Sequence, residues 1–145
     1  MAFFKNYDPG KIIVVFNGVQ LQGFADGDFV EVSRESDAFT DDVGSQGDVV
    51  RVRSRDRRGT VGITLQAASP SNDIMSAYAA TDESAGTAYG PVMVKDLNGT
   101  TIIRGNNAWI KKLPDTAYGK DHGSRKWEIR VAELEMLVGG EVGDV

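Results

Sequence analysis

The 145-residue sequence contains no cysteine and only one histidine, His122. The absence of cysteine excludes disulfides, thiolate metal sites and cysteine nucleophiles, and a single histidine excludes a multi-histidine metal site within one subunit. The longest unbroken apolar run, residues 12–16, is far shorter than the roughly 20 residues that span a bilayer, so we expect no membrane anchor. The N-terminus lacks the pattern of a signal peptide, and we expect the chain to act in a cytoplasm-like compartment.

Proline is also scarce, with four residues, whereas glycine occurs seventeen times. Many glycines between short segments of alternating apolar and polar residues are typical of an all-β domain and not of a helix bundle. The length predicts a single domain over residues 1–145. The net charge of −5 argues against a free nucleic-acid binder, which usually presents a basic surface.

Alternation of apolar and polar residues predicts a series of short strands. Residues 11–16 and 19–22 should form a hairpin, because Asn17-Gly18 between them is a strong signal for a two-residue turn. Residues 49–54 and 59–65 are expected to form a second hairpin. Further strands are expected over residues 29–34, 91–95, 100–104, 108–112, 126–131 and 133–138.

One helix is predicted over about residues 70–80. Ser69-Pro70 supplies an N-cap residue followed by proline at the first helical position. Asp73 places a negative charge in the first turn, where the helix dipole favours it. Apolar residues then recur at helical spacing: Ile74, Met75, Tyr78 and Ala79. The predicted fold is therefore mainly β, an antiparallel β-sandwich or barrel with one flanking α-helix.

A polar loop at about residues 35–48 is long for a compact domain, which indicates a functional or mobile segment. Its acids lack the spacing of a calcium loop, so we interpret them as solvated. Phe39 either folds back on its own domain or inserts into a neighbouring subunit, since aromatic residues dominate interface hot spots. The candidate contact residues of this loop are Glu35, Asp37, Phe39, Asp41, Asp42, Val43 and Asp48.

An arginine-rich segment follows the acidic loop. Its members are Arg51, Arg53, Arg55, Arg57 and Arg58. Alternate arginines on a strand can bind phosphates in a salt-dependent way, or they can form a solvated face. They can also meet acids of a neighbouring copy, where opposite charges set register and partner choice. The acids just upstream favour this subunit-interface interpretation.

His122 lies between Asp121 and Ser124 and gives the only indication of hydrolytic chemistry. Residues adjacent in sequence rarely form a nucleophile–base–acid set, and no nucleophile-elbow pattern is present. Asn98-Gly99-Thr100 matches a glycosylation sequon, which we interpret as a turn. We therefore expect no catalytic residues, no cofactor and no metal.

A recognisable order of segments runs along nearly the whole chain. It comprises residues 23–30, 37–40, 43–44, 51–54, 58–61, 69–73, 94–97, 99–101, 108–110, 127–128 and 135–140. This order resembles the tail tube proteins of contractile-tailed bacteriophages and prophages. The resemblance implies a single tail-tube domain with a sandwich-like barrel, similar to the tube protein of type VI secretion systems. It also implies a structural protein and not an enzyme.

The resemblance further implies that six copies form a ring, that their strands join into one β-barrel around a lumen, and that rings stack into a tube. The implied partners are other copies of the chain and the sheath, tape-measure, baseplate and tail-terminator proteins. DNA would pass through the lumen without sequence-specific binding. The implied location is the virion tail, after assembly in the host bacterial cytoplasm.

A lumen face should be polar, small or acidic, so that DNA slides without binding. Residues of these kinds alternate with apolar neighbours at Glu31, Ser33, Thr60, Gly62 and Thr64. The loop at about residues 35–48 resembles in position the extended loop with which tube proteins contact the next ring. Two alternatives remain open: a tube-end protein (terminator or initiator) of the same tail, and a nucleic-acid-binding β-barrel that uses the arginines.

Overall fold

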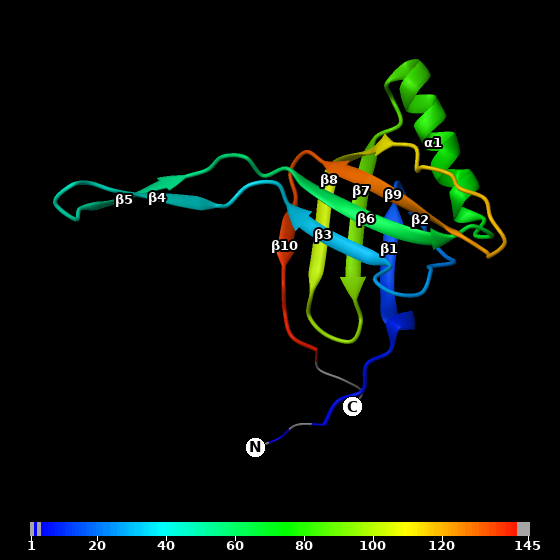
Figure 1. The fold of residues 1–145 in the computed structure, drawn as a ribbon, viewed down its shortest axis with the longest axis horizontal. Coiled ribbons are helices and arrows are strands. Elements are labelled where there is room, and N and C mark those ends of the chain that lie inside the picture. Colours follow the sequence, from blue (N-terminus) through cyan, green and yellow to red (C-terminus); the bar gives the residue numbers. More distant parts are fainter. Residues whose placement is uncertain (1, 3, 142–145) are drawn as a thin grey trace.

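The computed structural model describes residues 2 and 4–141, which form one α-helix and ten β-strands (Figure 1). The helix, α1, spans Ser71–Ala85. The strands are β1 (Ile12–Phe16), β2 (Val19–Gln20), β3 (Val30–Arg34), β4 (Phe39–Val43), β5 (Val49–Arg53), β6 (Gly59–Gln66), β7 (Gly90–Asp96), β8 (Ile102–Lys112), β9 (Ser124–Val131) and β10 (Glu135–Leu137).

Eight strands form one antiparallel sheet in the order β2-β1-β7-β8-β9-β6-β3, with β10 paired to β8. The sheet folds over itself, so that β3, β6 and β9 cross in front of a layer formed by β1, β7, β8 and β10 (Figure 1). Residues 102–105 of β8 pair with β7, residues 102–104 also pair with β10, and residues 108–112 pair with β9. The strands expected over residues 100–104 and 108–112 are therefore one continuous strand that belongs to both layers.

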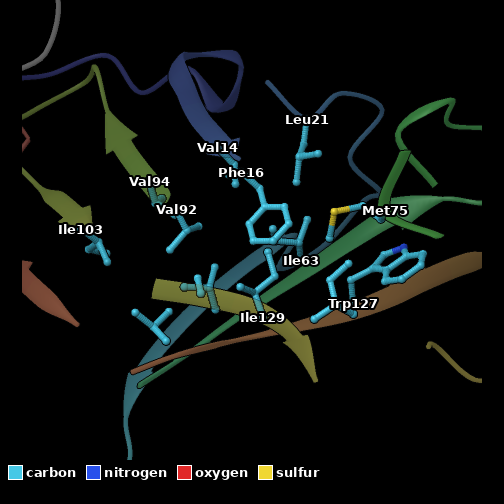
Figure 2. Close-up of a cluster of buried hydrophobic side chains, with 14 of the residues drawn as sticks. Val14, Phe16, Leu21, Ile63, Met75, Val92, Val94, Ile103, Trp127 and Ile129 are labelled. Carbon is cyan, nitrogen blue, oxygen red and sulfur yellow. The ribbon is translucent and has the colours of Figure 1, made fainter. Parts of the chain in front are cut away.

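The hydrophobic core lies between these two layers (Figure 2). Val14 and Phe16 of β1 meet Ile63 of β6 and Ile129 of β9, and all four side chains are fully buried. The alternation of apolar and polar residues expected for half-buried strands is thus confirmed in β6 and β9. The mainly β fold with one flanking helix is confirmed as well.

Helix α1 packs on the core through Met75 and Ala79. The ring of Tyr78 lies edge-on to Phe16, with 5.6 Å between centroids, and the indole N–H of Trp127 donates to the Asn72 side chain at 2.9 Å. The helix runs five residues beyond the expected end, to Ala85, before Gly86 ends it with a left-handed φ of 68°. Pro70 and not Ser69 is the N-cap, so the helix begins at Ser71, one position later than expected.

The Asn17-Gly18 turn between β1 and β2 is confirmed, with φ values of 55° and 83°. The second expected hairpin is wrong, because β5 pairs with β4 while β6 lies between β3 and β9. The segment expected as a polar loop therefore contains a strand. Neither β4 nor β5 shows the alternation of buried and exposed residues that marks a half-buried strand, because every residue of both strands is exposed.

Candidate assembly surfaces

Strands β4 and β5 form a separate two-stranded hairpin that projects from the sandwich (Figure 1). We call residues 39–53 the arm. Its pairs run from Phe39 opposite Arg53 at the base to Val43 opposite Val49 at the tip. The Gly44 N–H donates to the Asp48 carbonyl at 2.8 Å and closes the tip, where Gly47 has a φ of 87°.

The arm presents apolar side chains to solvent on both faces. Because opposite residues of an antiparallel pair share a face, the first face carries Phe39, Asp41, Val43, Val49, Arg51 and Arg53. The second face carries Thr40, Asp42, Val50 and Val52. Each of the four valines is more than half exposed. An isolated two-stranded hairpin is marginally stable in water, and exposed apolar patches mark contact sites, so this geometry suits contact with another chain.

One charged residue of the arm, Arg51, contacts other residues of the arm. The guanidinium of Arg51 lies over the Phe39 ring, 4.1 Å from its centroid, and Asp41 is the residue opposite Arg51. Asp42 lies on the other face, opposite Val50. Phe39 therefore does not fold back into the core, and remains 44% exposed.

A network around Asp56 fixes the base of the arm, which we call the stem (residues 34–38 and 54–58). The Asp56 carboxylate accepts from the Ser36 hydroxyl at 2.8 Å and from two nitrogens of the Arg58 guanidinium at 2.9 Å. The hydrogen bonds from Arg58 are the main cause that holds the pKa of Asp56 well below its usual range. Asp56 in turn raises the pKa of Arg58.

Further bonds tie the stem to the sandwich. The Arg34 guanidinium donates to the Leu134 carbonyl at 2.9 Å, and the Leu134 N–H donates to the Arg57 carbonyl at 2.8 Å. Glu35 pairs with Arg130 of β9 at 3.0 Å. Of the predicted interface arginines, Arg58 is thus engaged within its own chain. Arg53, Arg55 and Arg57 line a shallow pocket together with Ala132 and Glu133.

The residues predicted to face the lumen lie together on the outer side of the β3–β6–β9 layer. Glu31 is opposite Gly62 and Ser33 is opposite Thr60, and across β6 the pairs are Thr60 with Arg130 and Thr64 with Lys126. We call this surface the polar face; it also includes Glu128 of β9 and Lys111 of β8. Lys126 and Arg130 were not predictable here, although both alternate with buried residues, because the sequence pattern does not reveal that β9 lies beside β6.

Cations of the polar face lie beside acids. Lys126 lies 3.6 Å from Glu31, Arg130 lies 3.0 Å from Glu35, and Lys111 lies 3.9 Å from Glu128. Arg130 also donates to the Thr60 hydroxyl at 3.3 Å. These positive charges on the polar face are thus offset by neighbouring carboxylates.

His122 lies in the exposed segment between β8 and β9. In the described part of the chain, no hydrogen bond joins the side chains of Asp121, His122 and Ser124, and no group of acids and histidine is arranged to hold a metal ion. Asn98 of the sequon is 2% exposed, and its side-chain amide donates to the Asp8 carbonyl at 3.0 Å, as a structural turn residue would. No helix among the described residues is long and apolar enough to cross a membrane.

The stem network makes a prediction for Asp56→Asn. The substitution removes the ionised acceptor of the Arg58 guanidinium, so we expect trypsin to cleave the native protein after Arg55, Arg57 or Arg58 several-fold faster than in the wild type. Asp48→Asn in the tip turn carries the same charge change and should leave this rate unchanged. Equal cleavage rates in the two variants would contradict a bracing role for Asp56.

The same carboxylate gives the stem a direction of pH dependence. Because the folded-state pKa of Asp56 is depressed, its stabilising contribution is fully present above the ordinary pKa of about 3.9. The contribution is lost as the pH falls through the lower folded-state value. Amide hydrogen exchange in the stem measures this effect without trypsin. We expect the stem amides to exchange faster in Asp56→Asn than in the wild type, and we expect this difference to shrink in strong acid.

The chain is similar to known phage proteins. The family model of the Bacteriophage PhiTE tail tube protein matches residues 12–139. A structural protein, ORF10, of Pseudomonas phage KPP10 is 27% identical over 144 residues, which cover 94% of this chain and 83% of that protein.

Solved structures share the fold at low sequence identity. The sheath/tube terminator of the extracellular contractile injection system PVC matches with a TM-score of 0.67 and 10% identity, covering 94% of this chain and all of the other. The tube-terminating cap of the anti-feeding prophage matches with a TM-score of 0.62 and 11% identity over 94% of each chain. A chain of the PVC sheath-tube complex matches with a TM-score of 0.60 and 10% identity over 91% of each chain.

The family match covers most of the chain, and the fold agrees with it. The family is one of structural phage proteins, which makes this chain a virion component and not an enzyme. The chain belongs to the Bacteriophage PhiTE tail tube protein family.

Proposed function

We propose that this chain is the repeating subunit of a contractile phage tail tube. Six copies form a ring around a lumen, rings stack into a tube, and DNA passes through the lumen when the sheath contracts. The observation that carries this proposal is the arm, a braced hairpin whose two faces expose apolar side chains. Contact with another chain would bury these apolar side chains. In a self-assembling protein, that other chain is a second copy of the same subunit.

The polar face suits the wall of the lumen. It is built from small and polar residues of β3 and β6, and the cations of β9 are paired with acids on neighbouring elements. Paired cations offer DNA phosphates fewer favourable contacts than free ones, so a strand of DNA can slide past. The same pairing argues against a nucleic-acid-binding barrel as the function of this chain.

The remaining partners follow from the assembly that we propose. A sheath protein would cover the outer surface of the tube. This agrees with the match to a chain of the PVC sheath-tube complex, which shares the fold. A tape-measure protein would occupy the lumen during assembly, and baseplate and terminator proteins would bind the two ends. Assembly of the subunits would take place in the host bacterial cytoplasm.

A second candidate is a protein that ends the tube and does not repeat along it. Two structures that share the fold are described as terminators, with TM-scores of 0.62 and 0.67. The fold therefore occurs in two terminators and in a chain of a sheath-tube complex. The two functions differ in whether both faces of a ring bind further copies of the same chain.

Negative-stain electron microscopy of the purified protein, with light scattering of the same sample, tests the proposal. Hollow tubes many rings long are expected for the repeating subunit. Single rings that never lengthen at rising concentration would assign the chain to a tube end. A monomer that binds DNA in a salt-sensitive way would overturn both in favour of the nucleic-acid-binding barrel.

The arm should be needed for assembly and dispensable for folding. Phe39→Ala and Asp42→Lys change exposed arm residues, so we expect shorter or fewer tubes by electron microscopy and sedimentation, with an unchanged melting temperature. Asp41→Lys is a different test, because it places a like charge opposite Arg51 and weakens the arm itself. Tyr118→Ala, which truncates an aromatic residue that is 87% exposed elsewhere, is the control and should assemble normally. Normal tubes from Phe39→Ala and Asp42→Lys would remove the arm from the assembly contact.

Pairing on the polar face makes a prediction about DNA. The double variant Glu31→Gln/Glu35→Gln frees Lys126 and Arg130, so we expect it to bind duplex DNA more tightly than the wild type. The slope of log affinity against log salt should steepen by roughly 1 for each freed cation. Asp41→Asn/Asp42→Asn makes the same change in net charge on the arm. Equal gains in the two variants would show that net charge, and not pairing, controls DNA binding.

A further inference from the structure

A second exposed apolar surface lies between the two layers of the sandwich, on a side where no pairing of the described strands joins them. A groove of about 420 Å³ opens beside β3. Val30 and Val32 of β3 form one wall, and the other wall includes Ile103 of β8, Met136 of β10 and Val138. Among the described strands, β3 pairs with β6 alone and β10 pairs with β8 alone, so no ladder seals this side.

The groove is apolar and open to solvent. Val30, Val32 and Met136 are only partly buried, since they pack on the core from one side. Val138 at the rim is 74% exposed. An apolar groove that a chain leaves uncovered marks a site for another protein segment.

The acidic residues of the groove indicate which kind of segment it binds. Asp28 and Asp96 are among its lining residues. The first face of the arm carries two arginines, Arg51 and Arg53, and one acid, Asp41, which lies opposite Arg51. Arg53 therefore remains for the acids of the groove and Val43 and Val49 for its apolar walls, so this face complements the groove in both charge and apolar character.

The arm cannot reach the groove of its own chain. The Asp56 network and the Arg34–Leu134 bond hold the stem so that the arm points away from the sandwich (Figure 1). β3 lines the groove and leads directly into the stem, which carries the arm away from the sandwich. The occupant must come from a different molecule.

We infer that the first face of the arm of one copy docks in the groove beside β3 of a second copy. This inference rests on the proposed assembly of many copies and names the acceptor of the arm. Each copy then donates one arm and accepts another at a different place on its surface. When two copies do not exchange arms reciprocally, a contact of this heterologous kind propagates from copy to copy into rings or helical stacks.

The absence of cysteine from the sequence permits a clean cross-linking test. One protein carries Val49→Cys at the arm tip, and a second carries Val138→Cys at the groove rim. The two are mixed under assembly conditions and treated with a short bifunctional maleimide, and covalent dimers are measured on denaturing gels. The matched control replaces the second protein with Ser84→Cys, an exposed position near the end of α1.

We expect the arm–groove mixture to give at least tenfold more mixed dimer than the arm–helix control. Equal yields from the two mixtures would overturn the inference, as would a Val138→Cys protein that cross-links mainly to itself, since two grooves would then face each other. Electron microscopy of the same samples separates this outcome from the proposed function. Tubes without the arm–groove cross-link refute the groove and leave the tube standing, whereas the cross-link without rings or tubes supports the groove and refutes the tube.

Discussion

Pairing of β8 with three other strands holds the two layers of this molecule together. The layers approach closely where glycine leaves room. A Cβ at Gly105 would lie 2.2 Å from Cγ1 of Val131, and a Cβ at Gly59 would lie 2.2 Å from Cδ2 of Leu134. Leu134 is fully buried, and its backbone binds Arg34 and Arg57 of the stem. The packing that closes the core therefore also sets the direction of the arm.

The arm itself adds nothing to that core, because all of its strand residues are exposed. Its order depends on the stem, where Asp56 joins Ser36 to Arg58. A braced arm loses less conformational freedom on docking than a free loop would, which favours the bound state. In the proposed assembly, this division between a buried core and an exposed arm separates the residues that fold the chain from those that bind the next copy.

Much of the fold was predictable from the sequence, because buried strands such as β6 and β9 carry the alternation that burial imposes. The helix was placed from its cap and apolar spacing, although its last turn, Asp82 to Ala85, has no apolar signal that marks the end. The arm was not predictable as a hairpin, since β4 faces solvent on both sides and its residues Thr40, Asp41 and Asp42 look like a loop. The ion pairs of the polar face were not predictable either, because they depend on β9 lying beside β6.

The net charge of −5 gives a poor description of the surface that DNA would meet in the proposed tube. On the polar face, Lys126 and Arg130 sit beside Glu31 and Glu35, and beyond a Debye length of about 8 Å the fields of such pairs are largely screened. Free cations on such a wall would hold DNA in place. Paired charges do not, so a face of this kind lets a polyanion pass without binding it. The acids that make the chain negative can then serve other surfaces, including the groove that we assign to the arm.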